Sequence, residues 1–358
     1  MITRSAVAFT ALSLVLLAAV VRADYGANDA LKPPCRGLMS RDVPAPPGMP
    51  FLDNVCVQVA WRDLESADGV FDGKGWDKIE TARKANLKIR LRIFAGVHTP
   101  DFIKRLGGPA LSDPDHGTDA SKTGGIAMWN RHDNRGGTVP YWWTPQFLDR
   151  YECLMREVAK RYEDVPEIRE VVDSACMTLY AEPFYRAHAD APTNERLFRA
   201  GLTFEKDRAA HERALRIHND LFKHTRTSLA INAWDVIDDS PSHLTISFKP
   251  TYEFVTWARA FMGEKLVLQN NGMGVEAACR PGQSAQTNHF CFLSQAAGPK
   301  GFQTRTLARL GGTADDLFKT LDVALKFGAN FVELPNGFRR FDKATLRDYD
   351  QKLEHTPM

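Results

Sequence analysis

The 358-residue sequence contains no run of lysine or arginine, and its formal net charge is only +2. Proteins that bind nucleic acid or acidic membrane surfaces use concentrated positive charge to attract phosphate groups. Nucleic acid is therefore not expected as a partner. A membrane is not expected either, once the signal peptide predicted at residues 1–23 is removed. The sequence also lacks a Gly-rich phosphate loop after an early strand and a Gly-x-Ser-x-Gly elbow. These absences argue against a dinucleotide-binding sheet and against a serine hydrolase of that type.

Recognisable metal-binding spacings are absent as well. The nearest combination of ligand types is His132, His289 and Glu182, and their separations match no known zinc motif. We therefore expect no metal and no cofactor. No internal repeat, low-complexity tract or linker indicates a second domain.

The N-terminus has the composition of a secretory signal peptide. Arg4 is followed by an apolar or small-residue stretch over residues 6–21, and Ala23 is a small residue suited to a cleavage site. A membrane anchor is the alternative, but it would need about 20 apolar residues. We predict that residues 1–23 are removed and that residues 24–358 form a secreted or periplasmic protein.

Six cysteines accompany this leader, an even number that suits disulfide formation in an oxidising compartment: Cys35, Cys56, Cys153, Cys176, Cys279 and Cys291. Their spacing does not fix the pairing. Cys279 and Cys291 flank a loop rich in Pro, Gly, Ser and Gln, and they are the first candidates for a bridge. Cys56 and Cys176 lie inside apolar runs, where buried free thiols are expected.

Short apolar runs alternate with helical patterns along the chain. This order predicts parallel strands joined by helical crossovers, and eight of them predict a single closed (β/α)8 barrel, an α/β fold. An open doubly wound sheet is the alternative. The predicted strands cover residues 37–40, 54–61, 87–94, 171–180, 228–234, 265–269, either 289–293 or 301–304, and 330–334. In the third, Lys88, Arg90 and Arg92 alternate with apolar residues, which indicates charge layers inside the barrel.

Residues 107–141 show no sustained periodicity and predict a long loop, and loops of that length are usually functional or disordered. In a parallel barrel, the chemistry lies at the carboxyl ends of the strands. The residues there are polar and aromatic, a mixture typical of a carbohydrate cleft. The residues predicted to contact sugar are Trp61, Arg92, His98, Trp129, Trp142, Trp143, Asn232, Trp234, Asn270, Asn271 and Gln303.

Four segments between Trp61 and Phe184 carry a family resemblance: residues 61–72, 89–93, 160–166 and 179–183. They resemble the TIM-barrel glycoside hydrolases of the large retaining clan that includes β-galactosidases and cellulases. In that clan a glutamate after the fourth strand, usually in Asn-Glu-Pro, is the acid/base catalyst. The resemblance gives this role to Glu182. Its alternative role is a structural carboxylate paired with Arg92.

Two positions depart from the clan pattern. Ala181 stands where an asparagine normally precedes the acid, and Gln295 or Gln303 stands where a glutamate nucleophile is expected after the seventh strand. Amides cannot act as carboxylate nucleophiles. Glu333, after the eighth strand, is the nearest replacement, and its place across the barrel favours the wider carboxylate separation of an inverting enzyme.

Glu333 has an alternative role as a barrel-closing carboxylate bound to Arg339 or Arg340, and Asp235 and Glu276 are weaker catalytic candidates. The sequence thus predicts a secreted glycoside hydrolase that cleaves O-glycosidic bonds of a poly- or oligosaccharide by carboxylate acid/base catalysis. The alternative is a non-catalytic, carbohydrate-binding barrel that lost its nucleophile.

Overall fold

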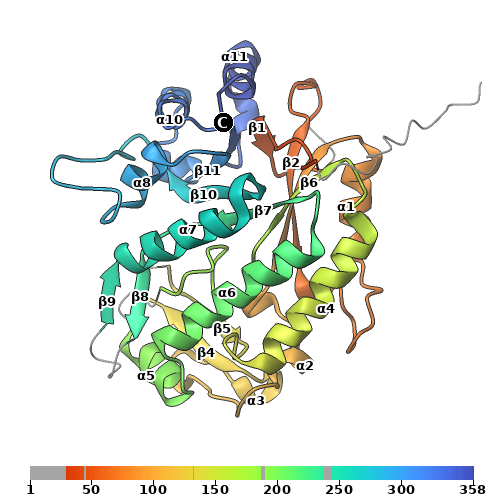
Figure 1. The fold of residues 1–358 in the computed structure, drawn as a ribbon, viewed down its shortest axis with the longest axis vertical. Coiled ribbons are helices and arrows are strands. Elements are labelled where there is room, and N and C mark those ends of the chain that lie inside the picture. Colours follow the sequence, from red (N-terminus) through yellow and green to blue (C-terminus); the bar gives the residue numbers. More distant parts are fainter. Residues whose placement is uncertain (1–29, 44–45, 132, 187–189, 238–243) are drawn as a thin grey trace, which may run out of the picture.

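Eight parallel strands close into a barrel, and helices surround it (Figure 1). The computed structural model describes residues 30–43, 46–131, 133–186, 190–237 and 244–358. Around the barrel the strand order is β1-β12-β11-β10-β7-β6-β3-β2, and every neighbouring pair is parallel. The strands are β1 (Gly37–Ser40), β2 (Asn54–Ala60), β3 (Lys88–Phe94), β6 (Ile168–Val172), β7 (Arg226–Ala230), β10 (Leu266–Met273), β11 (Lys300–Thr304) and β12 (Phe331–Glu333). The predicted (β/α)8 fold is confirmed.

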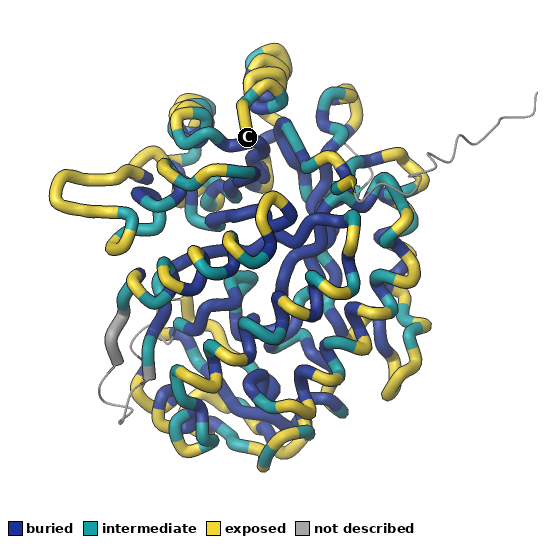
Figure 2. Tube along the Cα trace, in the orientation of Figure 1, coloured by how far each residue is buried: buried dark blue, intermediate teal, exposed yellow. Residues whose placement is uncertain are grey.

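The helices bury one face against the barrel and expose the other, as Figure 2 shows. Helix α4 (Pro145–Tyr162) begins where the Thr144 side chain caps the backbone N–H of Phe147 and Pro145 occupies the first turn. The other long helices are α1 (Gly75–Lys84), α6 (Phe204–Leu221), α7 (Lys249–Met262), α10 (Ala314–Lys326) and α11 (Lys343–Glu354). Short helices α2 (Asp101–Lys104), α3 (Ala120–Thr123), α5 (Ala191–Arg199), α8 (His289–Gln295) and α9 (Leu307–Leu310) lie in the connections.

The seventh strand is β11, and the competing assignment at residues 289–293 is wrong. That segment belongs to helix α8, because the Asn288 side chain accepts hydrogen bonds from the backbone N–H groups of Phe290 (2.7 Å) and Cys291 (3.2 Å). Such a cap supplies partners for the first amides of a helix. It therefore favours a helical start over an extended chain.

The fourth strand, β6, ends at Val172, earlier than predicted. At that point the Asp173 carboxylate accepts from the N–H of Ala175 (3.3 Å), and the N–H of Ser174 donates to the Tyr151 hydroxyl (3.1 Å). These bonds divert the backbone from the sheet. Glu182 consequently lies on a loop beyond the strand rather than at its last residue.

Two connections contain sheets of their own. Within the predicted long loop, β4 (Ile126–Asn130) and β5 (Arg135–Val139) form an antiparallel hairpin. Beyond β7, which ends at Ala230, β8 (Trp234–Ile237) pairs with β9 (Leu244–Ser247), so the fifth strand is shorter than predicted. Both pairs lie outside the barrel (Figure 1).

The interior of the barrel holds the predicted charge layer. Arg90 donates to the Ser228 hydroxyl (2.9 Å) and pairs with Glu170 (3.4 Å), and all three side chains are buried. Arg92 pairs with Glu333 at 2.7 Å. Lys88 differs, because it pairs with Asp53 in a partly exposed position.

One disulfide joins Cys279 to Cys291, the pair predicted first. Cys56 and Cys176 are buried free thiols, as expected; Cys35 is also buried and free, and Cys153 is exposed. The predicted signal peptide, residues 1–23, lies outside the described residues. Within the described part of the chain, no helix combines the length and apolar character needed to cross a membrane.

Replacing Arg90 by methionine should lower the free energy of unfolding by about 3–5 kcal/mol, because it leaves Glu170 as an unpaired buried charge. Arg83→Met is the matched control, since Arg83 pairs with Glu80 on the surface of α1, and its cost should stay within about 1 kcal/mol. Urea unfolding of both variants checks this. If both variants lowered the free energy of unfolding by the same small amount, the Arg90–Glu170 pair would not stabilise the barrel.

Candidate active site

A cavity of about 650 Å³ opens among the loops that follow the barrel strands. Five residues that the sequence predicted for the site come together in its wall: Glu182, Asn232, Asn270, Asn271 and Gln303. They follow or end β6, β7, β10 and β11, so the parallel barrel brings side chains from distant parts of the sequence to one end. The wall is otherwise rich in arginine and asparagine, with His289, Phe290 and Tyr180 adding aromatic surface.

Glu182 lies in the cavity wall with 16% of its side chain exposed. Its carboxylate is 3.9 Å from the Arg186 guanidinium, which is too long for a hydrogen bond. Arg92, the alternative partner considered from sequence, is committed to Glu333 and Gln303. The Glu182 carboxylate therefore faces the cavity, and no cationic group of the described residues lies within hydrogen-bond distance of it.

The loop that carries Glu182 is anchored behind the cavity. The Phe184 ring packs edge-on against the Trp234 ring, with 4.9 Å between the ring centroids. The backbone carbonyl of Phe184 accepts a hydrogen bond from the Asn232 side chain at 3.4 Å. Nearer the mouth, the Tyr180 hydroxyl donates to Asp133 at 2.6 Å. The loop is thus held before Glu182 by the hydrogen bond of Tyr180 and after Glu182 by the packing and hydrogen bond of Phe184.

Glu333 is fully buried and is not among the residues that line the cavity. Its oxygens accept from Arg41 (2.5 Å) and Arg92 (2.7 Å), with Arg90 at 3.5 Å. Burial alone would raise the pKa of Glu333, but the charges of Arg92, Arg41 and Arg90 outweigh it and lower the pKa to about 2.

Glu333 is therefore placed as an interior carboxylate that closes the barrel, although with other arginines than expected. Arg339 pairs with Asp42 instead (2.6 Å), and Arg340 donates to the Gly312 carbonyl (2.6 Å).

The two glutamines at the expected nucleophile position lie apart. Gln303 lines the cavity and accepts from Arg92 at 3.2 Å, whereas Gln295 is exposed on α8 and is not among the lining residues. Asp235 is buried on β8, and Glu276 forms an ion pair with Arg305 at the rim.

Three of the predicted sugar-stacking tryptophans lie in the core instead. Trp61, Trp142 and Trp234 are fully buried, and a ring enclosed on both faces cannot stack on a sugar. Their indole N–H groups donate to carboxylates, Trp61 to Glu65 at 2.7 Å and the other two to Asp207 at 2.8 Å. This placement corrects the expectation that they form sugar-binding platforms.

The remaining predicted aromatic and histidine contacts lie away from the lining residues as well. Trp143 packs edge-on against Trp142, and Trp129 stacks on His116 with 4.3 Å between ring centroids. His98 packs against Phe94, on the loop after β3. These positions give them structural contacts in the loops around the barrel mouth.

Several cavity residues were not predicted from the sequence. Asn130 and Asp133 come from the β4–β5 hairpin, Arg186 and Arg305 come from loops, and Arg309 comes from the short helix α9. The Asp133 carboxylate pairs with Arg309 at 2.9 Å and accepts from Tyr180. Asn130 and Asp133 lie in the segment predicted to be a loop, and Arg186 and Arg309 lie beyond the predicted strand ends, so the search at strand ends did not reach them. Arg305 directly follows β11 and was passed over.

His289 lies in the wall but is not a ready proton donor. The pKa of His289 is lowered to about 4, mainly because the ring is buried and to a smaller extent because Arg186 is positively charged. Its imidazole is therefore neutral near pH 7. This leaves carboxyl groups as the acids of the cavity. His132, the other histidine considered as a metal ligand, lies outside the described residues.

Comparisons with known proteins found no matching family model and no matching curated protein. The similar solved structures are glycoside hydrolases. Endo-glycoceramidase II from Rhodococcus sp. is 15% identical with a TM-score of 0.43, and the match covers 78% of this chain and 64% of that one, less than two thirds. An intracellular xylanase from Thermoanaerobacterium saccharolyticum is 12% identical with a TM-score of 0.41, over 84% of this chain and 85% of the xylanase.

A third structure, described as a glycoside hydrolase, is 12% identical with a TM-score of 0.46, over 92% of this chain and all of that one. Similarity at this level does not carry a substrate or a catalytic residue from one protein to another. The fold rests on the strand pairing of the chain itself.

Glu333→Gln should destabilise the protein by about 3 kcal/mol or more at pH 7, because the buried guanidinium groups of Arg90 and Arg92 and the partly exposed one of Arg41 lose their carboxylate. The pKa of Glu333 is lower in the folded state, so its contribution is complete above the unfolded pKa near 4.5 and is lost as the pH falls toward about 2. The difference between wild type and variant should narrow over that range. Denaturant titrations between pH 7 and pH 3 test this, and a constant difference would contradict the assigned ion pairs.

Proposed function

We propose that this protein is a glycoside hydrolase that cleaves O-glycosidic bonds in a poly- or oligosaccharide, with Glu182 as the general acid. The observation that carries the proposal is a partly exposed carboxyl group in a polar cavity at the carboxyl ends of barrel strands. Hydrolysis of a glycoside needs such a group to protonate the leaving oxygen. Arg186, at 3.9 Å, leaves the oxygens of Glu182 free to reach a ligand.

The amide side chains around Glu182 support a sugar as the ligand. Asn232, Asn270, Asn271 and Gln303 share the wall, and each offers both a donor and an acceptor. The Oδ1 atom of Asn232 and the Nδ2 atom of Asn271 are buried, and no described residue forms a hydrogen bond with either atom. Sugar hydroxyls, which both donate and accept, would satisfy such atoms.

The second carboxylate we propose is Asp133, because Glu333 is enclosed by arginines. Among the described residues that line the cavity, Asp133 is the acid besides Glu182. Its hydrogen bond from Tyr180 and its pair with Arg309 favour the ionised form, which a base or nucleophile requires. Glu333 is left with an indirect role, since it orients Arg92 and through it Gln303.

The alternative is a carbohydrate-binding protein without catalytic activity. It is favoured by Gln303, an amide where the related clan has a carboxylate, and by the full neutralisation of Glu333. Such a protein would keep the amide-lined cavity and bind sugar without turnover.

We also propose that the protein is secreted or periplasmic. The predicted signal peptide and the Cys279–Cys291 disulfide support this location, because disulfides persist in oxidising compartments. A saccharide substrate outside the cell would be accessible there.

Glu182→Gln should lower kcat for polysaccharide hydrolysis by about 10²–10⁴-fold, because the leaving oxygen loses its proton donor. Nitrophenyl glycosides have leaving groups that need no protonation, so their hydrolysis should fall much less. Initial rates on a panel of both substrate types measure these effects.

The matched control is Glu195→Gln, an exposed glutamate on nearby α5, which should keep wild-type rates. If Glu182→Gln lowered the rates on polysaccharides and nitrophenyl glycosides equally, Glu182 would not be the general acid. Measurable sugar binding by a wild-type protein without turnover on any substrate would favour the binding protein.

Asp133→Asn should reduce turnover of polysaccharides and nitrophenyl glycosides alike, by about 10²-fold or more, because activation of the attacking group is needed whatever the leaving group. Tyr180→Phe, which removes the hydroxyl group that donates to Asp133, should have a smaller effect. Single-substrate kinetics on both variants test the assignment. Full activity of Asp133→Asn would show that another group activates the attacking atom.

A further inference from the structure

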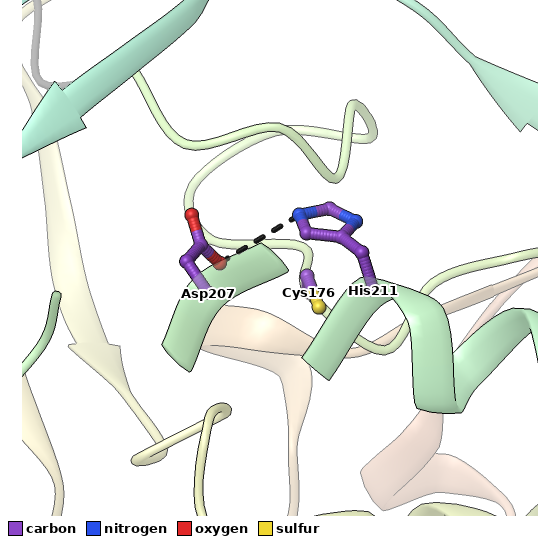
Figure 3. Close-up of side chains that lie close together, drawn as sticks. All are labelled: Cys176, Asp207 and His211. Atoms are coloured by element: carbon purple, nitrogen blue, oxygen red, sulfur yellow. Dashed lines mark ion pairs between the residues drawn. The ribbon is translucent and has the colours of Figure 1, made fainter. Parts of the chain in front are cut away.

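A second cluster of reactive side chains lies behind the cavity wall, between the loop that carries Glu182 and helix α6. Cys176 Sγ, a carboxylate oxygen of Asp207 and a ring nitrogen of His211 all lie within 4.8 Å of one another. All three residues are buried. Figure 3 shows Asp207 and His211 projecting from the helix toward each other, with Cys176 approaching from the loop.

Among the described residues, neither ring nitrogen of His211 has a hydrogen-bond partner, although the side chain is fully buried. Its nearest carboxylate oxygen, on Asp207, is 3.6 Å away, beyond hydrogen-bond range. The ring is enclosed by Phe184, stacked at 4.9 Å between centroids, and by Trp234 at 4.8 Å. A buried polar group without a hydrogen-bond partner destabilises the folded state, so the arrangement calls for a ligand.

His218 on the same helix shows what a satisfied histidine looks like here. It is equally buried, and its Nε2 atom lies 2.8 Å from the Tyr151 hydroxyl. The difference between the two histidines is therefore not their burial or their helix. The two histidines differ in hydrogen bonding: His218 has a partner among the described residues, and His211 has none.

We propose that Cys176, Asp207 and His211 bind a zinc ion. Thiolate, imidazole and carboxylate are the three ligand types that zinc takes in proteins. A thiolate and a carboxylate together carry two negative charges, which the charge of Zn²⁺ cancels. The occupied site is thus neutral overall, as its surroundings of buried aromatic rings require.

The distances suit this ion with a small adjustment. Two ligand atoms about 2.1 Å from one zinc ion at a tetrahedral angle lie about 3.4 Å apart, and the His211–Asp207 separation is 3.6 Å. A thiolate about 2.3 Å from the ion would lie about 3.6 Å from each of the others, so it moves inward by at most about 1.2 Å from the observed limit of 4.8 Å. Water or the second Asp207 oxygen completes the tetrahedron.

The Asp207 carboxylate is already oriented for this role. Trp142 donates to its Oδ1 atom and Trp234 to its Oδ2 atom, both at 2.8 Å. Hydrogen bonds of this kind hold metal-binding carboxylates in position. The ion would join α6 to the loop of Cys176 and Glu182, so its role is structural, and the proposal does not depend on glycosidase activity.

The experiment measures metal in the purified full chain, without any sugar present. After chelation and reloading with ZnCl₂, elemental analysis should find about one zinc per chain. Reloading with CoCl₂ should give the thiolate-to-cobalt charge-transfer absorption, which reports on cysteine coordination directly. The loaded protein should unfold at a higher temperature than the chelated protein, because the ion binds the folded state.

Matched variants locate the site. Cys176→Ala and His211→Asn should each lose the equimolar metal, and Cys176→Ala should also lose the charge-transfer absorption. Cys56→Ala and His218→Asn, which change a buried free thiol and a buried histidine elsewhere, should keep both signals. Circular dichroism of each variant verifies that it is folded.

A folded wild-type protein that takes up neither zinc nor cobalt overturns the proposal, even if the variants at the cluster fail to fold. Equimolar metal that survives Cys176→Ala and His211→Asn overturns it as well, because the ion then lies elsewhere. Glu182→Gln should bind zinc normally. Failure of the glycosidase assignment and failure of the metal site are therefore read from separate measurements.

Discussion

The Glu333 carboxylate is the centre on which the arrangement of the barrel mouth depends. It comes from the last strand and accepts from Arg41 after the first strand and from Arg90 and Arg92 on the third, across the barrel interior. A buried carboxylate that satisfies several guanidinium groups restricts the relative positions of the strands that supply them. Because Arg92 also donates to Gln303, this interior network extends to the floor of the cavity.

The alternation of strands and helices could be predicted from the sequence because the periods of the two elements differ. The interior arginines of β3 were predicted for the same reason, since side chains on a strand point alternately to its two faces. The limits of β6 could not be predicted. Residues 171–180 read as one extended segment, and the turn after Val172 depends on bonds to Asp173 and to Tyr151 on a distant helix.

The candidate site was predicted only in part. Proximity to a strand end led to Glu182 and the amides, which line the cavity, but also to Trp234, which is buried in the core. Trp142, which was predicted from the long loop, is buried there as well. A position next to a strand end does not determine whether a side chain faces the cavity or the layer between barrel and helices. For these tryptophans the carboxylate of Asp207, far along the chain, holds the indoles in that inner layer.

The β4–β5 hairpin is built as an attachment to the barrel rather than as part of it. Its two strands form a sheet of their own, with one further bridge from Ile126 to Leu111. Thr193 and Arg196 of α5 hold it by bonding to the backbone of Trp129 and Ala127. It nonetheless supplies Asn130 and Asp133 to the cavity. Replacements in this hairpin would therefore change the lining of the cavity while the eight barrel strands keep their sequence.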